Sequence, residues 1–331
     1  MKNQQKKIKL IIQIPCFNEE HTLPHTFDAL PRKISGIDEI KVLVIDDCST
    51  DDTVNVAKEL GVDYIVKNKK NMGLARSFRK GVDACLQHGA DIIVNTDGDN
   101  QYDGRDIEKL IFPVLNKQAD IAIGDRETAK IPHFSVLKKV LQRWGSFVVR
   151  QLSGVDVPDA VSGFRAISRE AAIRLNIVSS YTYTTEMIIQ AGIKHMVVSS
   201  VPVRTNPKTR PSRLFSHPFK FVQRQATIML RMYAMYKPLH FFFYIGSVFT
   251  IIGLVPVIRF MSFYFAGAGE GHIQSLVLGG VFLLMGLVTY LVALVADLQN
   301  FNRQLIEMTL EKVRRMELKG DGENDPNKDR S

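Results

Sequence analysis

The chain has 331 residues, of which 45% are apolar and 23% charged, and its formal net charge is +9. This composition excludes a disordered or fibrous chain, and the length allows two or three domains. The three cysteines, Cys16, Cys48 and Cys85, form no CxxC pair, so we expect neither a disulfide framework nor a zinc site. Residues 1–237 read as a soluble, basic domain, whereas residues 238–296 are almost uncharged. This split excludes both a purely soluble enzyme and a multi-span channel.

Short β-rich runs alternate with helical stretches through the first two hundred residues. We expect strands at residues 8–14, 40–45, 64–66, 91–95 and 121–123. We expect helices near residues 19–30, 51–60, 73–88 and 104–117. Such alternation is typical of a doubly wound, mostly parallel α/β sheet with helices on both faces.

Three polar clusters follow three of these strands. They are PCFNEE at residues 15–20, IDDCSTDDT at 45–53 and TDGDNQ at 96–101. All three fall at the carboxyl edge of the predicted sheet, where ligands of doubly wound sheets bind, so they could converge there. Since neither glycine-rich nucleotide fingerprint is present, a nucleotide would have to be bound through carboxylates and a metal.

The Asp97-Gly98-Asp99 triplet would project two carboxylates toward one point. Carboxylate oxygens suit Mg²⁺ or Mn²⁺, and such ions usually bridge a carboxylate to substrate phosphates. The residue types alone also fit a turn. In the second cluster, Ser49 and Asp51 equally suit capping of the helix that begins near residue 52.

A basic stretch precedes the apolar part, because residues 204–237 hold eight Lys or Arg and no Asp or Glu. Apolar side chains recur in it every three or four positions, from Phe215 to Tyr233, with cations opposite. This pattern predicts an amphipathic helix that lies in the membrane interface. A helix packed on the soluble domain is the alternative interpretation.

Two long apolar runs follow, at residues 238–258 and 273–296, without Asp, Glu, Lys or Arg over 21 and 24 positions. About 20 apolar residues suffice for a helix to cross a bilayer, so we expect two spans, with a buried core hairpin as the alternative. The connecting loop, 259–272, holds one Arg and one Glu. The positive-inside rule therefore predicts that the soluble domain and both termini are cytoplasmic.

Residues 297–318 resemble a second amphipathic segment, and the polar tail from Lys319 is expected to be disordered. The sequence thus predicts four parts, bounded at 1–205, 206–237, 238–296 and 297–331.

The clusters PCFNEE, IDDCSTDDT and DGDNQ, in this order and at these distances, resemble the catalytic domain of family 2 glycosyltransferases, which has the GT-A fold. The segment VSGFRAISRE at residues 161–170 resembles the SGFR motif of dolichol- and polyprenyl-phosphate hexosyltransferases. The two apolar runs fit the membrane-anchored members of that subfamily. The resemblance covers about residues 8–236, and it departs at Cys48, where the family often has Gly.

The resemblance implies roles for single residues. The nucleotide-sugar donor would be bound by Pro15, Phe17, Glu19, Asp47, Asp97 and Gly98. Asp99 and Gln101 would contribute to a Mg²⁺ or Mn²⁺ site, and the catalytic residues would be Asp97, Asp99 and Arg126. The acceptor phosphate would be gripped by Arg126, Lys208, Arg210, Ser212 and Arg213. The same basic run also suits ordinary membrane-topology determination.

The implied reaction moves a hexose from a UDP- or GDP-sugar to a polyprenyl monophosphate of dolichyl or undecaprenyl type, with inversion at the anomeric carbon. A phosphate monoester is mostly dianionic at pH 7, so this nucleophile needs no protein base. Arginine suits its neutralisation, because the guanidinium binds phosphate oxygens bidentately. Mannose, glucose and N-acetylglucosamine all stay open as the sugar.

An alternative is a membrane-bound family 2 transferase that glycosylates a saccharide or lipid hydroxyl, with Glu186 as general base. Glu186 equally suits the N-terminus of a helix, where the macrodipole favours a carboxylate. A third interpretation, a non-catalytic membrane scaffold, is disfavoured by the intact DxD triplet and Gln101. We expect no nucleic-acid partner, because the positive charge is concentrated beside the spans and there suits anionic lipid.

Overall fold

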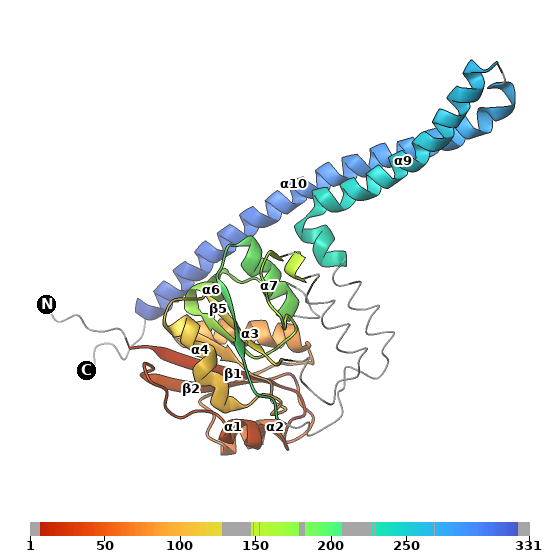
Figure 1. Cartoon of the computed structure of the whole chain (residues 1–331). Coiled ribbons are helices and arrows are strands. Elements are labelled where there is room, and N and C mark those ends of the chain that lie inside the picture. The colour runs from red at the N-terminus through yellow and green to blue at the C-terminus, as the bar shows by residue number, and fades with distance from the viewer. Residues whose placement is uncertain are drawn as a thin grey trace. The chain divides into compact units, whose positions relative to one another are not determined.

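The structure is a computed structural model of the chain. It describes residues 7–127, 147, 149–151, 153–178, 183–206, 227, 230–267 and 269–323. The chain divides into two compact units, one formed by Met1–Val222 with Glu311–Ser331 and the other by Gln223–Leu310. Figure 1 labels their elements.

The first unit is built on a sheet with the strand order β3-β2-β1-β4-β6-β5-β7. The strands are β1 (Lys9–Cys16), β2 (Glu39–Asp46), β3 (Tyr64–Lys67), β4 (Ile92–Asn95), β5 (Ile121–Asp125), β6 (Arg165–Ser168) and β7 (Val198–Pro202). Strand β6 runs antiparallel to β4 and β5, and the other pairs are parallel. The predicted mostly parallel α/β sheet is therefore confirmed, and its five predicted strands correspond to β1 to β5.

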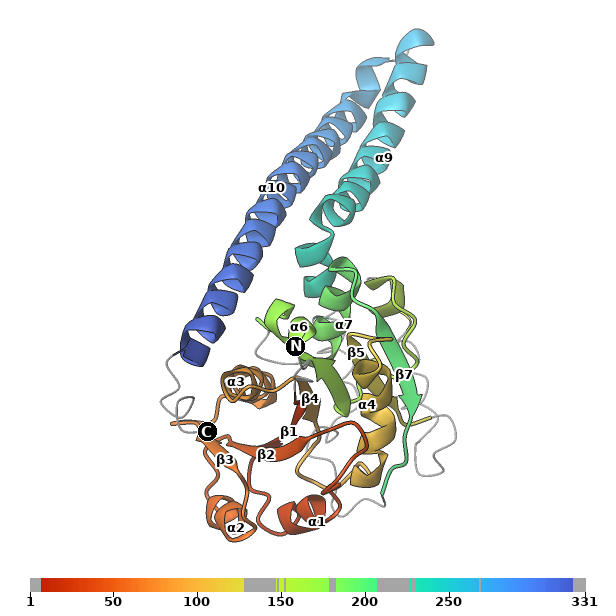
Figure 2. The same cartoon turned by 90° about the vertical axis from the view of Figure 1, so that its left-hand side faces the viewer.

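Helices cover both faces of this sheet. They are α1 (Leu23–Asp28), α2 (Thr53–Glu59), α3 (Leu74–Gln87), α4 (Ile107–Leu115), α6 (Arg169–Arg174) and α7 (Tyr183–Ile193), with the 3₁₀ turn η1 (Gly104–Asp106) before α4. Figure 2 shows α3 and α4 on opposite sides of the sheet. The four helices expected from the sequence are α1 to α4.

The alternation of side chains along β1 explains the two layers. Leu10, Ile12 and Ile14 face one apolar core together with residues of α1, α2 and α4. Gln13 lies on the other face, under α3, where a Cβ added to Gly81 would lie 2.5 Å from the Gln13 Oε1 atom. Because strands buried on both faces need apolar residues at nearly every position, the β1 sequence is an almost continuous apolar run.

The second unit contains two long helices joined by the 3₁₀ turn η3 (Gly269–His272). Helix α9 covers Pro238–Phe265, and α10 covers Ile273–Glu323, of which the part up to Leu310 belongs to this unit. Both helices are long and apolar enough to cross a membrane. Large apolar side chains such as Phe243, Ile251 and Leu284 are exposed along them, which a buried core hairpin would not leave.

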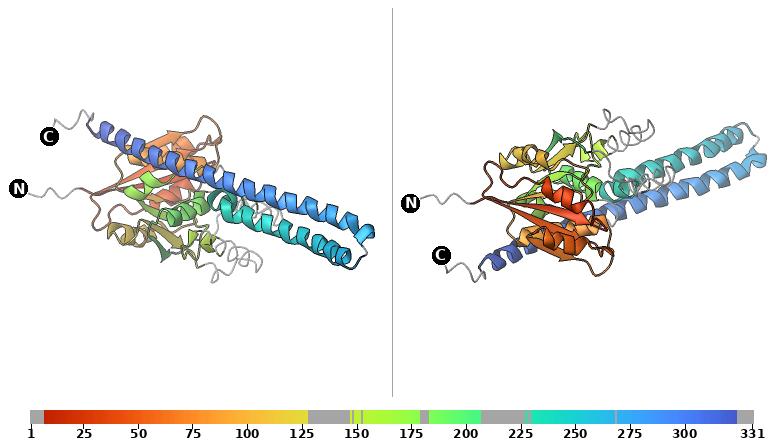
Figure 3. Two further views of the ribbon diagram at one scale, coloured as in Figure 1. Left: turned by 90° about the horizontal axis from the view of Figure 1, so that it is seen from above. Right: turned by 90° about the horizontal axis from the view of Figure 1, so that it is seen from below.

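Helices α9 and α10 run side by side (Figure 3). Glycines lie where they touch: a Cβ on Gly253 would lie 3.0 Å from the Gly279 carbonyl oxygen, and one on Gly286 would lie 2.5 Å from Thr250 Oγ1. The Ser247 and Tyr290 hydroxyls are 3.1 Å apart across the same pair. Small residues therefore allow the two backbones to approach closely.

Helix α10 is longer than the sequence predicts. It continues without a break to Glu323, so the expectation of disorder from Lys319 is wrong for residues 319–323. Extending an existing helix costs little compared with starting one, and Arg314 and Arg315 hold the preceding turn on the first unit. Most of the amphipathic helix expected within 206–237 lies outside the described residues.

Candidate active site

The site lies at the carboxyl edge of the sheet, where β1 and β4 are neighbours. From β1 the chain proceeds to β2 and β3 on one side, whereas β4 lies on the other side of β1. This is the topological switch point at which doubly wound sheets bind ligands. The loop after β1 and the loop after β4 both begin here, so the first and third polar clusters do converge.

The loop after β4 carries the paired carboxylates of Asp97 and Asp99. Burial and, second, the nearby Asp99 carboxylate raise the pKa of Asp97 to about 7, although Arg126 opposes the shift. The Asp99 Oδ1 atom accepts a hydrogen bond of 3.1 Å from the Gln101 backbone N–H, which folds the loop back on itself. The loop thus brings two carboxylates together at a partly buried place, close enough for Asp99 to act on the pKa of Asp97.

The SGFR segment packs against the Asp97 carboxylate through Gly163. A Cβ on Gly163 would lie 3.1 Å from both Asp97 carboxylate oxygens, so a side chain there would press on them. Gly163 is held from both sides, since its N–H donates to the Tyr102 hydroxyl (3.0 Å) and its carbonyl accepts from Asn95 Nδ2 (2.8 Å). The Asn95 side chain also accepts from Gln13 Nε2 at 2.9 Å inside the sheet.

The PCFNEE cluster packs against the same loop. A Cβ on Gly98 would lie 3.0 Å from Cys16 Sγ, and the Gly98 carbonyl accepts from Thr26 Oγ1 at 3.2 Å. Pro15 and Glu19 are buried and Phe17 is partly exposed. The structure therefore brings Pro15, Glu19 and Gly98, three of the residues predicted to bind the donor, into one neighbourhood.

The loops after β1 and β2 are joined by hydrogen bonds. Asn18 N–H donates to Ser49 Oγ (3.0 Å), and Glu19 N–H donates to Thr53 Oγ1 (2.8 Å). Asp51 Oδ1 accepts from the Thr53 N–H at 3.1 Å, at the start of α2. The Asp51 side chain thus contacts the first residue of α2, whereas the N-cap position is Asp52, which makes no side-chain capping bond.

Asp47 has internal partners for both carboxylate oxygens. Its Oδ1 accepts from Asn68 Nδ2 and from the Met72 N–H, and its Oδ2 accepts from the Gly73 N–H, each at 2.8 Å. The side chain therefore fixes the segment before α3 to the end of β2. A nucleoside that binds here would meet a loop that Asp47 has already ordered.

Arg126, which follows β5, forms a bidentate ion pair with Asp159, with Nε–Oδ2 and Nη2–Oδ1 distances of 2.7 and 3.0 Å. Both side chains are largely buried, at 11% and 2% exposure. Arg126 is also among the charges that act on Asp97. Its guanidinium is thus held beside the carboxylate pair rather than extended into solvent.

Two other residues that sequence patterns single out are interior. Arg165 of the SGFR segment is fully buried, donates to the Ala160, Ser162 and Thr184 carbonyls, and has its pKa lowered to about 10 by burial. Glu186 is fully buried in α7, and its Oε1 accepts from the Val178 N–H at 3.1 Å. Arg165 thus joins the SGFR segment to α7, and Glu186 fixes the chain that precedes α7.

The donor set fits a divalent cation of the Mg²⁺ or Mn²⁺ type. Among the residues that the structure describes, no group of three or more His, Cys, Asp or Glu side chains could enclose a metal. Such ions need only one or two protein carboxylates when substrate phosphates and water supply the other ligands. A cation bound here would favour the ionised form of Asp97, whose pKa burial and Asp99 raise.

The structure leaves four of the predicted site residues undescribed and adds two that support the site. Lys208, Arg210, Ser212 and Arg213 lie outside the described residues. The sequence does not indicate Asp159 and Tyr102, which fix Arg126 and Gly163. No local signal marks either residue, because each acts on a partner at least 33 positions away.

The chain matches the model of the Glycosyl transferase family 2 over residues 11–175. An uncharacterised protein of Methanocaldococcus jannaschii is 31% identical over 208 residues, which cover 61% of this chain and 84% of that relative. The UDP-N-acetylglucosamine–dolichyl-phosphate N-acetylglucosaminyltransferase of Methanococcus voltae is 29% identical over 60% of this chain and 86% of its own. The dolichol-phosphate mannosyltransferase of Pyrococcus furiosus is 28% identical over 59% of this chain and 56% of its own.

Among solved structures, the fold is similar to that of glucosyl-3-phosphoglycerate synthase from Mycobacterium tuberculosis, crystallised with Mn²⁺, UDP and glucosyl-3-phosphoglycerate. The TM-score is 0.52, with 18% identity, over 67% of this chain and 80% of that one. This likeness confirms the GT-A fold. A chain with this sheet and this family match belongs to glycosyl transferase family 2, and it is a glycosyltransferase.

Proposed function

We propose that this enzyme transfers a hexose from a nucleotide-diphosphate sugar to a polyprenyl monophosphate at a membrane surface. The proposal rests chiefly on the Asp97–Asp99 pair at the switch point of the sheet, where carboxylates could hold a cation that a donor diphosphate would share. Relatives named for dolichyl phosphate and two helices able to cross a membrane support the lipid acceptor. The neighbour crystallised with Mn²⁺ and UDP supports a nucleotide-sugar donor.

The chemistry asks mainly for positioning and charge neutralisation. A bound divalent cation would stabilise the charge that grows on the departing nucleoside diphosphate. Asp99 and Gln101 would hold that cation, with Asp97 beside it, while Pro15, Phe17 and Glu19 would line the nucleoside pocket. Asp47 would orient the nucleoside through the segment that it fixes before α3.

The acceptor phosphate would act as the nucleophile. Its oxygen forms the new bond to the anomeric carbon as the bond to the diphosphate breaks, so the anomeric centre inverts. No proton has to be removed, because the phosphate is mostly dianionic at pH 7. Arg126 would reduce the repulsion between the two anions from beside Asp97, and Lys208, Arg210, Ser212 and Arg213 would hold the acceptor phosphate.

The burial of Glu186 supports this acceptor over a hydroxyl acceptor. A general base has to reach the proton that it removes, directly or through one water. Glu186 is instead fully buried and accepts a hydrogen bond from the Val178 backbone. We therefore assign it a structural role, in which it fixes the chain that precedes α7.

The test uses membranes that contain the full-length enzyme, polyprenyl phosphate and a panel of radiolabelled UDP- and GDP-sugars. We expect label from one donor in the organic extract, a loss of at least 100-fold in Asp99→Ala, and at least one third of the activity in Glu186→Gln. Inactive Glu186→Gln together with active Asp99→Ala would instead favour a hydroxyl acceptor. Absence of lipid label with every donor would contradict the proposal.

A further inference from the structure

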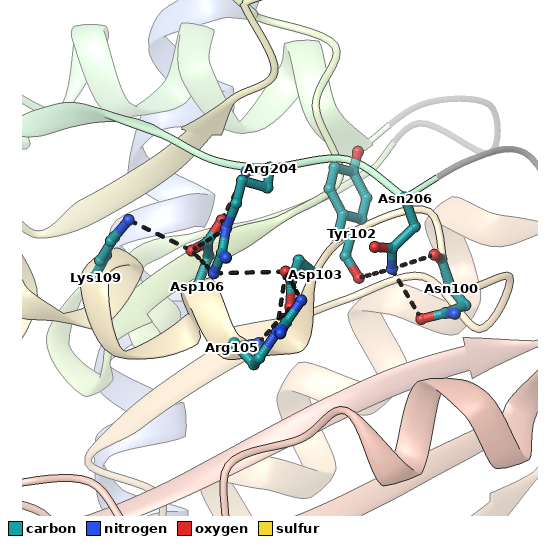
Figure 4. Close-up of polar contacts among 8 residues, drawn as sticks. All are labelled: Asn100, Tyr102, Asp103, Arg105, Asp106, Lys109, Arg204 and Asn206. Carbon is teal, nitrogen blue, oxygen red and sulfur yellow. Dashed lines mark hydrogen bonds and ion pairs between the residues drawn. The ribbon is translucent and has the colours of Figure 1, made fainter.

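The chain that leaves β7 runs along the loop that leaves β4. We call residues Asp97–Tyr102 the cation loop, after its proposed role. Tyr102 and Thr205 form an antiparallel bridge between the two segments. Figure 4 shows the contacts on either side of this bridge. Residues 207–213, which carry the predicted acceptor-phosphate cations, begin directly after the last of these contacts.

Arg204 makes the first contact, outside the cation loop. Its guanidinium lies 2.7 Å from Asp106 Oδ1 and 3.5 Å from Asp103 Oδ2, and its backbone N–H donates to Asp106 Oδ2 at 2.7 Å. The Asp106 side chain is fully buried, whereas that of Arg204 is 55% exposed. Arg204 therefore anchors the chain to the start of α4.

Asn206 makes the second contact, on the cation loop itself. Its backbone N–H donates to the Gln101 carbonyl at 2.9 Å. Its side-chain Nδ2 donates to the Asn100 carbonyl at 3.0 Å and lies 3.4 Å from the Tyr102 carbonyl. One residue thus contacts three consecutive carbonyls of the loop, and Figure 4 shows the side-chain contacts to Asn100 and Tyr102.

These three carbonyls belong to the part of the loop that gives the carboxylate pair its shape. Asn100 has a positive φ of 55°, a conformation that side-chain-bearing residues adopt rarely and keep only when their surroundings fix it. The Gln101 N–H is the donor that folds the Asp99 carboxylate back on the loop. Releasing the carbonyls would therefore allow Asn100 to relax and Asp99 to move.

We infer that Asn206 is a positioning residue for the cation loop, so that the chain leaving β7 sets the affinity of the site for its divalent cation. The inference rests on the proposed function, because that function assigns the cation to Asp99 and Gln101. A loop that is already ordered loses less conformational entropy when the cation binds. Removing the Asn206 amide takes away its contacts with the Asn100 carbonyl, Asn100 Oδ1 and the Tyr102 carbonyl. We therefore expect about tenfold weaker cation binding.

The experiment measures Mn²⁺ binding to the full-length protein in detergent with saturating UDP, from the electron paramagnetic resonance signal of free Mn²⁺. We expect the Kd for Mn²⁺ to rise about tenfold in Asn206→Ala. Asn206→Asp keeps the size of the side chain but replaces the donating amide with a carboxylate, so it should weaken binding at least as much. In turnover assays the Mn²⁺ concentration for half-maximal rate should rise equally, while kcat at saturating Mn²⁺ stays within twofold.

Two control variants distinguish a specific effect of Asn206 on the cation loop from a general loosening of the chain that leaves β7. Asn116→Ala removes an exposed asparagine whose amide donates to the Phe112 carbonyl, and it should bind Mn²⁺ like the wild type. Arg204→Gln loosens the same chain outside the cation loop, and it should change the Kd less than threefold. The inference would be overturned if Asn206→Ala bound Mn²⁺ with wild-type affinity, or if Asn206→Ala and Arg204→Gln lost Mn²⁺ affinity equally. Either result would leave the proposed function intact. Absence of Mn²⁺ binding by the wild type would overturn the cation loop and with it the proposed function.

Discussion

Asp97 occupies a position that disfavours its own negative charge. It faces Gly163, which leaves its two oxygens room, and it stands beside a second carboxylate, Asp99. Burial and Asp99 together raise the pKa of Asp97 to about 7, from an ordinary value near 4. In the absence of a cation, folding therefore favours the protonated form of this side chain.

This shift predicts how stability depends on pH in the presence of a chelator. The folded state holds the Asp97 proton more tightly than the unfolded state, so the stability due to this group falls as the pH rises from about 4 to about 7. Asp97→Asn removes that loss. We expect its free energy of unfolding to exceed that of the wild type by about 2 kcal/mol at pH 8, because one pKa unit corresponds to about 1.4 kcal/mol and solvent screens part of the shift.

Denaturant unfolding in detergent with EDTA, between pH 4.5 and 8, measures this difference. Asp28→Asn, which removes an exposed carboxylate of α1, controls for the loss of one negative charge and should give a constant difference. An Asp97→Asn difference that is the same at pH 4.5 and pH 8 would contradict the assignment. The variant should also be inactive in transfer assays.

Single residues also mark the limit of what the sequence predicts. PCFNEE, IDDCSTDDT and DGDNQ indicate the correct edge of the sheet, because residues that follow parallel strands must meet there. The sequence does not indicate that Asp47 is bound by the Met72 and Gly73 backbones, or that Arg126 is bound by Asp159. These partners lie 25 to 33 positions away in the sequence, and only the complete fold brings them into contact.

At the scale of elements, β1 to β5 are predictable because each is a short apolar or β-rich run, and polar clusters follow three of them. Strands β6 and β7 are not, for two different reasons. Strand β6 has only four residues and includes the fully buried Arg165, so it lacks an apolar pattern. Strand β7 is paired only with β5 at the end of the sheet, and it is half-buried and rich in serine. Both depend on neighbours that the local sequence does not contain.

The hairpin of α9 and α10 provides a prediction about packing. Gly286 of α10 lies against α9, where a Cβ would be 2.5 Å from Thr250 Oγ1 and 3.2 Å from the Gly246 carbonyl oxygen. Gly286→Leu should force the helices apart and destabilise the hairpin by about 2 kcal/mol, because a backbone carbonyl cannot move aside as a side chain can. Thermal unfolding in detergent measures the effect.

Gly280→Leu is the matched control for this variant. Gly280 lies on the same helix, but a Cβ there would meet no atom within 4 Å. Equal unfolding midpoints for the two leucine variants would show that the close contact of α9 and α10 does not stabilise the hairpin.

At the scale of the whole molecule, the end of α10 belongs to the globular unit. Arg314 donates to the Leu175 carbonyl at 2.8 Å and forms an ion pair of 3.3 Å with Asp83, while Arg315 pairs with Glu170. Arg314 donates to the Ile173 and Leu175 carbonyls at the end of α6, where helical N–H groups no longer satisfy the carbonyls. A segment that the sequence presents as a plain basic amphipathic run is thus a packed part of the domain.

Loss of the Arg314 side chain should therefore free the last turns of α10. We expect hydrogen exchange of the backbone amides in residues 311–323 to become about tenfold faster in Arg314→Ala, because two hydrogen bonds and one ion pair are lost. Lys312→Ala removes an exposed cation from the same turn and should leave the exchange unchanged. The same rates in both variants would show that this end of α10 is held by other contacts.

The amide pair of Gln13 and Asn95 has a consequence for how the sheet assembles. The two residues are directly opposite each other on β1 and β4, and their side chains bond to each other in a buried place. A slip of two positions would set Gln13 against Ile93 and leave two amides unsatisfied, at about 1–3 kcal/mol each. Without these amides, an apolar run such as KLIIQIPC could pair with β4 in several registers. The buried amides disfavour the shifted registers and so keep the ends of β1 and β4 at the same level.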